Sequence, residues 1–163
     1  FIGAGKISRE VIKIAKVFNM KIYCNTLNPE KHQDLLQQGV EFVALDTLLS
    51  NSDIITVNIP LNEESRNLIS KDKIGLMKKT ATFINTSRAE IVDINQLIKY
   101  ADENDTFYVG LDIDAEYYKD ILGKKRNNVI VTPHIAGVTQ EAIKRMDIEL
   151  VNNIKGYLEN KIC

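Results

Sequence analysis

The stretch that decides the fold stands at the start of the chain and reads Phe1-Ile2-Gly3-Ala4-Gly5-Lys6-Ile7-Ser8. A strand stub runs here into a glycine turn, and apolar residues at positions 7, 11, 14 and 18 then follow the spacing of a helix. In a dinucleotide fingerprint, two glycines make such a turn and let backbone amides approach a pyrophosphate at the helix N-terminus. The third glycine of the fingerprint is Ser8 here, a small residue that still permits fairly close helix packing. Glycine turns also join strands to helices for packing alone, so the motif by itself is modest support for a cofactor.

The rest of the chain alternates short apolar runs with segments of helical spacing. The runs have the length and the Val, Ile, Phe and Tyr content of buried strands: Met20 to Cys24, Ile54 to Ile59, Ala81 to Ile84, Phe107 to Ile113 and Val129 to Val131. Asp93 is placed to cap a helix, and the longest apolar stripe predicts a helix from about Thr139 to Glu159. The pattern predicts an α/β fold of the Rossmann type, a doubly wound parallel sheet between helices in three αβα layers.

The composition excludes several classes of protein. With 163 residues, 21 Lys+Arg and 22 Asp+Glu, the chain suits one domain over residues 1–163 and has a formal net charge of −1. A near-neutral chain offers no basic field to nucleic acid, and no apolar run approaches the roughly 20 residues that span a bilayer. Two cysteines, Cys24 and Cys163, are too few for a disulfide scaffold and indicate a reducing, cytoplasmic setting. Because His and Cys do not cluster at ligand spacing, we expect no metal site.

Polar motifs follow the ends of the later strands, which is where open α/β sheets bind ligands. In chain order they are Asn58-Ile59-Pro60-Leu61, Asn85-Thr86-Ser87-Arg88, Gly110-Leu111-Asp112 and Thr132-Pro133-His134-Ile135-Ala136-Gly137. From Gly3 to about Glu141 the chain resembles the cofactor domain of the D-isomer-specific 2-hydroxyacid dehydrogenases, the family of phosphoglycerate, glycerate and D-lactate dehydrogenases. The Asn-Thr-Ser-Arg segment followed by Thr-Pro-His-x-Ala-Gly is far more specific than the glycine turn.

The resemblance, together with side-chain chemistry, implies roles for three catalytic candidates. His134 would be the acid/base, because imidazole titrates near neutral pH. Arg88 would bind the substrate carboxylate through its planar guanidinium, with pairing to Glu90 at the surface as the alternative. Glu116 would be the acid beside the histidine that favours its protonated form, although it stands one residue earlier than the family's acid; alternatively it is exposed at the start of a helix.

Two further positions depart from the family or allow another interpretation. Asp112 would lie near the nicotinamide and His134, and its alternative is to cap the next helix. The family has glycine after the arginine, where this chain has Ala89, and the extra methyl tests whether the backbone there needs an unusual φ.

The same resemblance implies a cofactor site for NAD(H). Its candidate residues come from the glycine turn and the strand ends: Gly3, Gly5, Lys6, Ile7, Thr26, Asn58, Pro60, Thr86, Ser87, Arg88, Asp112, His134 and Gly137. The second strand should end in an acid that binds the ribose, but this chain reads Asn25-Thr26-Leu27-Asn28. Neither an acid nor an arginine stands there, so NADP(H) stays open. Lys31 and His32 are the nearest candidates for a 2′-phosphate, or solvated residues at a helix start.

The implied function is hydride transfer between NAD(P) and a D-2-hydroxy acid, giving a 2-oxo acid. Two alternatives remain: a non-enzymatic, NAD(H)-sensing module like the corepressors that resemble this family, and a catalytically degenerate paralogue. The family dimerises through its cofactor domains and takes substrate-binding groups from a second domain. Since the chain begins without a methionine, inside a strand, we expect a fragment whose substrate domain is largely absent. The predicted helix near residues 139 to 159 would lead back toward that domain. The isolated chain should bind cofactor weakly without turnover.

Overall fold

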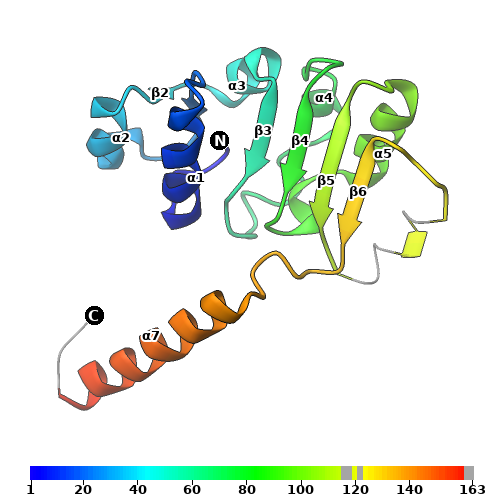
Figure 1. Ribbon diagram of the computed structural model, residues 1–163. Helices are drawn as coiled ribbons and strands as arrows, with labels where there is room; N and C mark the ends of the chain where they lie inside the picture. The colour runs from blue at the N-terminus through cyan, green and yellow to red at the C-terminus, as the bar shows by residue number, and fades with distance from the viewer. Residues whose placement is uncertain (115–118, 121–122, 160–163) are drawn as a thin grey trace. The chain divides into compact units, whose positions relative to one another are not determined.

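A parallel sheet organises residues 1–133 of the computed structural model, which describes residues 1–114, 119–120 and 123–159 (Figure 1). Its main part has the strands β3 (Ile54–Val57), β4 (Thr82–Asn85), β5 (Tyr108–Asp112) and β6 (Val129–Thr132), adjacent in that order. All three pairings are parallel, so the carboxyl ends of these strands lie at one edge. The polar motifs that follow β3, β4 and β5 therefore meet at that edge.

The first residues of the chain join this sheet to a second pair of strands, β1 (Tyr23–Cys24) and β2 (Glu41–Phe42). Ile2 forms parallel bridges with Asn25 on one side and Val57 on the other. Its amide donates to the Thr56 carbonyl at 2.9 Å, and the Asn58 amide donates to the Ile2 carbonyl at 2.8 Å. The spatial order is thus β2, β1, residues 1–3, β3, β4, β5, β6. This is the doubly wound Rossmann order, with its reversal of direction at residues 1–3, and it confirms the predicted fold class.

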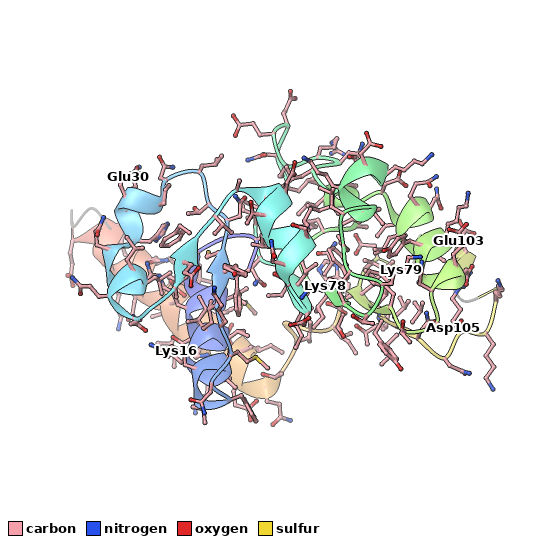
Figure 2. All side chains as sticks on the ribbon, turned by 90° about the horizontal axis from the view of Figure 1, so that it is seen from above. Lys16, Glu30, Lys78, Lys79, Glu103 and Asp105 are labelled. Atoms are coloured by element: carbon pink, nitrogen blue, oxygen red, sulfur yellow. The ribbon has the colours of Figure 1, made fainter. Side chains whose placement is uncertain are left out.

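Helices lie on both faces of the sheet. They are α1 (Lys6–Val17), α2 (Gln33–Gln37), α3 (Leu45–Asn51), α4 (Lys71–Ile74) and α5 (Ile94–Glu103), with 3-10 turns η1 (Pro29–His32) and η2 (Ala89–Ile91). Ile55 and Phe83 point into the core that α3, α4 and α5 build. Their neighbours Ile54 and Ile84 line the opposite face, beside α1, because side chains alternate along a strand. Seen from above, α1 with Lys16 and α5 with Glu103 lie at opposite ends of the sheet (Figure 2).

Residues 134–163 form a separate unit whose described part consists of a loop and the helix α7 (Gln140–Leu158). Thr139 caps this helix by accepting a hydrogen bond from the Ala142 amide at 3.1 Å, and Asp93 caps α5 in the same way through the Gln96 amide. The predicted helix from about Thr139 to Glu159 is close to the bounds of α7, and Asp93 caps α5 as the sequence predicts. No helix in the described ranges is both long and apolar enough to cross a membrane.

Candidate cofactor-binding site

The glycine turn lies where the strand order reverses, directly against the end of β3. Gly3 has φ +103°, and a Cβ at this residue would stand 2.6 Å from the carbonyl oxygen of Asn58 and 2.7 Å from Cγ2 of Ile59. A side chain is therefore excluded both by conformation and by space. At Gly5 the situation is the opposite, since none of the described atoms lies within 4 Å of such a Cβ. The backbone there is open, which a bulky anion needs.

The first turn of α1 offers backbone amides at this open position. The N-cap residue is Gly5, which has no side chain to bond them, and the first helical turn carries no acidic residue. Backbone amides that point out of a helix N-terminus, and the positive end of the helix dipole, favour an anion there. Gly3, Gly5, Lys6 and Ile7 lie together here as the sequence predicts, and the arrangement fits a pyrophosphate.

The side chain of Ser8, the residue in place of the third glycine, faces the interior of this turn and not the solvent. Its side chain is fully buried, and its hydroxyl donates to the Gly3 carbonyl at 2.7 Å. The residue therefore packs the helix on the strand while it satisfies a carbonyl of the turn.

The end of β1, where an adenine ribose would lie in this fold, is neutral. Asn25 uses its side chain to donate to the Val43 carbonyl at 3.0 Å, Thr26 is half-buried, and Leu27 is 83% exposed. This part of the site fits a ribose less well than the turn fits a pyrophosphate, since no carboxylate stands at residues 25–28 to accept from the ribose hydroxyls.

Behind this strand end, His32 belongs to a small surface cluster. Its Nδ1 lies 2.9 Å from the Arg9 guanidinium, and its ring stacks on Phe42 with centroids 6.1 Å apart. Arg9 also hydrogen-bonds Asp34, which lowers the pKa of that carboxyl. These contacts favour a structural role for His32, whereas Lys31 is exposed.

At the end of β4, a network around the buried Asn85 fixes the loop that carries Arg88. The Asn85 amide donates to the Arg88 carbonyl at 2.8 Å, and its oxygen accepts from the Ser87 amide at 2.9 Å. Ser87 in turn donates its hydroxyl proton to the Val57 carbonyl of the neighbouring strand at 2.9 Å. Asn85 was quoted in the sequence motif without a role of its own, and its complete burial is what reveals this one.

The Arg88 side chain is exposed beside this network, and the guanidinium donates to the Ser87 carbonyl at 2.8 Å. Within the described residues it forms no ion pair with Glu90, so the surface-pair alternative is not what the structure has. Arg88 itself is extended, with φ −138°, and the next residue starts η2. Ala89 has no positive φ and is buried, so its methyl is accommodated without strain.

Asp112 ends β5 and is 3% exposed. It accepts a 2.5 Å hydrogen bond from the Thr132 hydroxyl across the β5–β6 ladder. Asn58, Pro60, Thr86, Ser87, Arg88 and Asp112 thus all lie at or just beyond the carboxyl edge of the sheet, as predicted.

The remaining candidates are two residues of the second unit, His134 and Gly137, and Glu116. His134 begins the second unit with φ +54°, a left-handed conformation that is uncommon for residues other than glycine, and Gly137 follows in the same loop. Glu116 lies outside the described residues. The catalytic grouping of His134, Arg88 and Glu116 therefore stays a prediction.

A groove of about 690 Å³ runs beside α1 and β3, and it is largely apolar. Ile7, Val11 and Ile14 of α1 line it with Phe18 just beyond that helix and Ile54 of β3. Of the predicted site residues, the groove includes Ile7, Asn58 and Thr86. Apolar walls do not suit a charged dinucleotide, so the groove is not assigned to the cofactor.

A glycine turn at the strand-order reversal, an open helix N-terminus and polar loops at the carboxyl edge together define a Rossmann-type dinucleotide-binding domain. The sequence profile of the D-isomer specific 2-hydroxyacid dehydrogenase, NAD binding domain, matches residues 1–136, and the chain belongs to this family.

Relatives in this family support the assignment. The chain is 38% identical over 165 residues to a glyoxylate reductase of Thermococcus litoralis, covering 99% of the chain and 49% of that protein. It is also 38% identical to a hydroxypyruvate reductase of Thermotoga maritima, over 94% of this chain and 50% of that protein. The chain thus spans about half the length of these relatives.

Solved structures resemble this fold over similar lengths. An acyclic imino acid reductase, Bsp5, in complex with NADPH and D-Arg matches with a TM-score of 0.85 and 32% identity, over 98% of this chain and 50% of that one. A D-lactate dehydrogenase from Aquifex aeolicus complexed with NAD and lactic acid matches with a TM-score of 0.79 and 29% sequence identity. That match covers 98% of this chain and 53% of the other. Neighbours of this domain thus include both an NAD and an NADPH complex.

Proposed function

We propose that the protein to which this chain belongs interconverts a D-2-hydroxy acid and a 2-oxo acid by hydride transfer, with NAD(H) as cofactor and NADP(H) as the alternative. The observation that carries the proposal is Arg88, whose exposed guanidinium stands at the carboxyl edge on a loop fixed by the buried Asn85. A cation carried by a fixed loop, on the same sheet edge as an open glycine turn, suits a small carboxylate substrate beside a dinucleotide.

We expect two parts of the site to bind the two ends of the cofactor. The turn from Gly3 to Ile7 would hold the pyrophosphate through backbone amides, and Thr26 would face the adenine ribose. The nicotinamide end would be enclosed by Asn58, Pro60, Thr86, Ser87 and Asp112, with His134 and Gly137 from the loop that follows. A bound nicotinamide supplies hydride exchange with the substrate carbon, so the protein has only to bind, orient and move a proton.

Arg88 would bind the substrate carboxylate with two parallel hydrogen bonds and polarise the adjacent carbonyl. A planar guanidinium does both, because its donors match the two oxygens of a carboxylate. Its release from the Ser87 carbonyl would accompany substrate binding, since the same Nη1 donates there now.

His134 would remove the hydroxyl proton in oxidation and return it in reduction. The resemblance supports Glu116 as the acid that favours the protonated imidazole. Glu116→Gln should then shift the pH–rate profile of hydroxy acid oxidation. An unchanged profile in an active protein would refute the role.

The family resemblance also predicts the surroundings in which this domain works. We expect a substrate domain in the same polypeptide, a homodimer formed through the cofactor domain, and a cytoplasmic location. Light scattering on the full-length protein measures the dimer directly, and a monomer at micromolar concentration contradicts it.

The test of the function uses the full reading frame that encodes this chain. The expressed protein is mixed with NADH or NADPH and with glyoxylate, hydroxypyruvate or pyruvate, and cofactor oxidation is followed at 340 nm. Turnover that Arg88→Gln or His134→Gln abolishes supports the enzyme. Cofactor binding without turnover on any substrate contradicts it and favours the sensing module or the degenerate paralogue.

A further inference from the structure

The carbonyl oxygen of Gly3 is held by two side chains from different elements. The Ser8 hydroxyl of α1 donates to it at 2.7 Å, and the Cys24 thiol of β1 lies 3.5 Å away in donor geometry. Both side chains are completely buried. The fingerprint's third glycine has no side-chain donor, so the Ser8 hydroxyl adds a hydrogen bond that a glycine there cannot make.

The carbonyl that these side chains hold belongs to the most constrained residue of the turn. Gly3 has φ +103°, and its own amide donates to the Asn25 carbonyl at 2.8 Å. The peptide that follows is planar, so fixing the Gly3 oxygen also fixes the direction of the Ala4 amide and the path into Gly5. Without donors the oxygen would be a buried, unbonded acceptor, and glycine is the residue that most easily rotates to relieve this.

Burial also keeps the second donor in its useful form. It raises the pKa of the Cys24 thiol, so the S–H group persists at neutral pH. Cys24 packs in the apolar cluster with Ile12 and Ala15 of α1, which holds the thiol close to the turn.

We infer that Ser8 and Cys24 are positioning residues for the cofactor, which together fix the Gly3 carbonyl and so keep the turn and the first amides of α1 open toward the pyrophosphate. The inference rests on the proposed cofactor site at this turn. On this inference, the replacement of the fingerprint's third glycine by Ser8 adds a function to the turn and does not weaken the cofactor site. A rotated Gly3 peptide would turn its oxygen toward the phosphates and repel them.

The test measures NADH affinity by fluorescence titration of the full-length protein. Ser8→Ala should weaken binding about 2- to 5-fold and Cys24→Ala less than about 2-fold, because a thiol is the weaker donor. The double variant should lose at least about 10-fold, more than the product of the single losses, because only then is the shared acceptor left without a donor. Ser52→Ala, a buried serine outside the turn, is the matched control and should bind as the wild type does.

Steady-state kinetics separate positioning from general destabilisation. The KM for NADH should rise in the double variant while the KM for the 2-oxo acid stays within about 2-fold. Losses that merely multiply, or equal increases in both KM values, would overturn the inference. The inference would also be overturned if Ser8→Gly bound NADH as tightly as the wild type or more tightly. This single variant provides the test if the double variant does not fold. If the wild type binds neither NADH nor NADPH, the proposed function itself fails, together with the inference.

Discussion

Thr132 donates its hydroxyl proton to the Asp112 carboxylate at 2.5 Å, directly across the β5–β6 ladder. Asp112 is 3% exposed, and a carboxylate so deeply buried is stable only where hydrogen bonds replace its water. The pair also joins the last two strands at the carboxyl edge of the sheet. Thr132 therefore holds in place a side chain that the proposed site has beside the nicotinamide.

Thr132→Val should lower the stability of the folded state. It removes the donor at nearly constant volume, so the free energy of unfolding should fall by about 1–3 kcal/mol. Urea denaturation measures this loss, and Thr132→Ser, which keeps the hydroxyl, is the control. Equal stability of the valine and serine variants would show that the hydrogen bond contributes nothing.

The two glycines of the turn should respond differently to alanine. Gly3→Ala forces a Cβ against the Asn58 carbonyl at positive φ, so the folded state should lose at least about 2 kcal/mol. Gly5→Ala meets no described atom within 4 Å, so the free energy of unfolding should change by less than about 1 kcal/mol. NADH affinity should nevertheless fall at least about 10-fold, because the methyl occupies the space over the α1 amides.

Thermal denaturation and NADH titration of both variants check this contrast. If Gly5→Ala kept full affinity, the pyrophosphate would have to bind elsewhere.

Arg88→Lys should separate substrate binding from cofactor binding. Lysine keeps the charge but has no planar fork, so the KM for the 2-oxo acid should rise about 10-fold or more while the KM for NADH changes little. Because the Asn85 network bonds the backbone of residue 88, stability should not change. The control is Arg126→Lys. Arg126 pairs with Asp102 and precedes β6, so it lies near the amino end of that strand and away from the carboxyl edge of the sheet. Equal effects of the two substitutions would remove Arg88 from the site.

The sequence predicted the strands that lie inside the sheet and the two longest helical stripes well. Runs such as Ile54 to Ile59 and Phe107 to Ile113 contain β3 and β5, because buried parallel strands are continuously apolar. It did not predict β2, a pair of residues at the edge of the sheet, since Glu41 is exposed and the apolar signal is short. Edge pairing depends on tertiary contacts that no local pattern encodes.

The candidate site was predictable where residues follow a strand and not where a role depends on three-dimensional neighbours. Arg88 and Asp112 could be placed at the carboxyl edge from chain order alone. The roles of Asn85 and Ser8 come from burial and from hydrogen bonds to backbone carbonyls, which a sequence does not display. The resemblance suggested Glu116, and the structure does not describe that residue.

A salt bridge between α5 and the segment before β6 should make stability depend on pH in the acid range. Arg126 donates to both carboxylate oxygens of Asp102, at 2.8 and 3.2 Å, and Lys124 lies nearby. The Arg126 guanidinium lowers the pKa of Asp102 below 3.8 in the folded state. A lowered folded pKa means that the stabilisation is complete above the unfolded pKa and is lost as the pH falls through the folded pKa.

Asp102→Asn should therefore cost up to about 1 kcal/mol at pH 7, and the difference from the wild type should shrink as the pH falls from 4 toward 2. Urea denaturation across this range measures it. Asp105→Asn, just beyond the end of α5 (Figure 2), is the control and should show no such change. If the stability difference between Asp102→Asn and the wild type stayed constant with pH, the charge of Asp102 would not be its cause.

The neutral end of β1 should set cofactor choice, and Thr26 is the residue at which to change it. A carboxylate at this half-buried position would accept hydrogen bonds from the ribose hydroxyls and repel a 2′-phosphate. Thr26→Asp should therefore raise the ratio of kcat/KM with NADH to that with NADPH at least about 10-fold. Leu27→Asp adds the same charge one residue later on an 83% exposed side chain and should raise the ratio less than about 3-fold. If the two substitutions changed the ratio equally, general repulsion would explain the preference, and a specific contact between residue 26 and the ribose would be excluded.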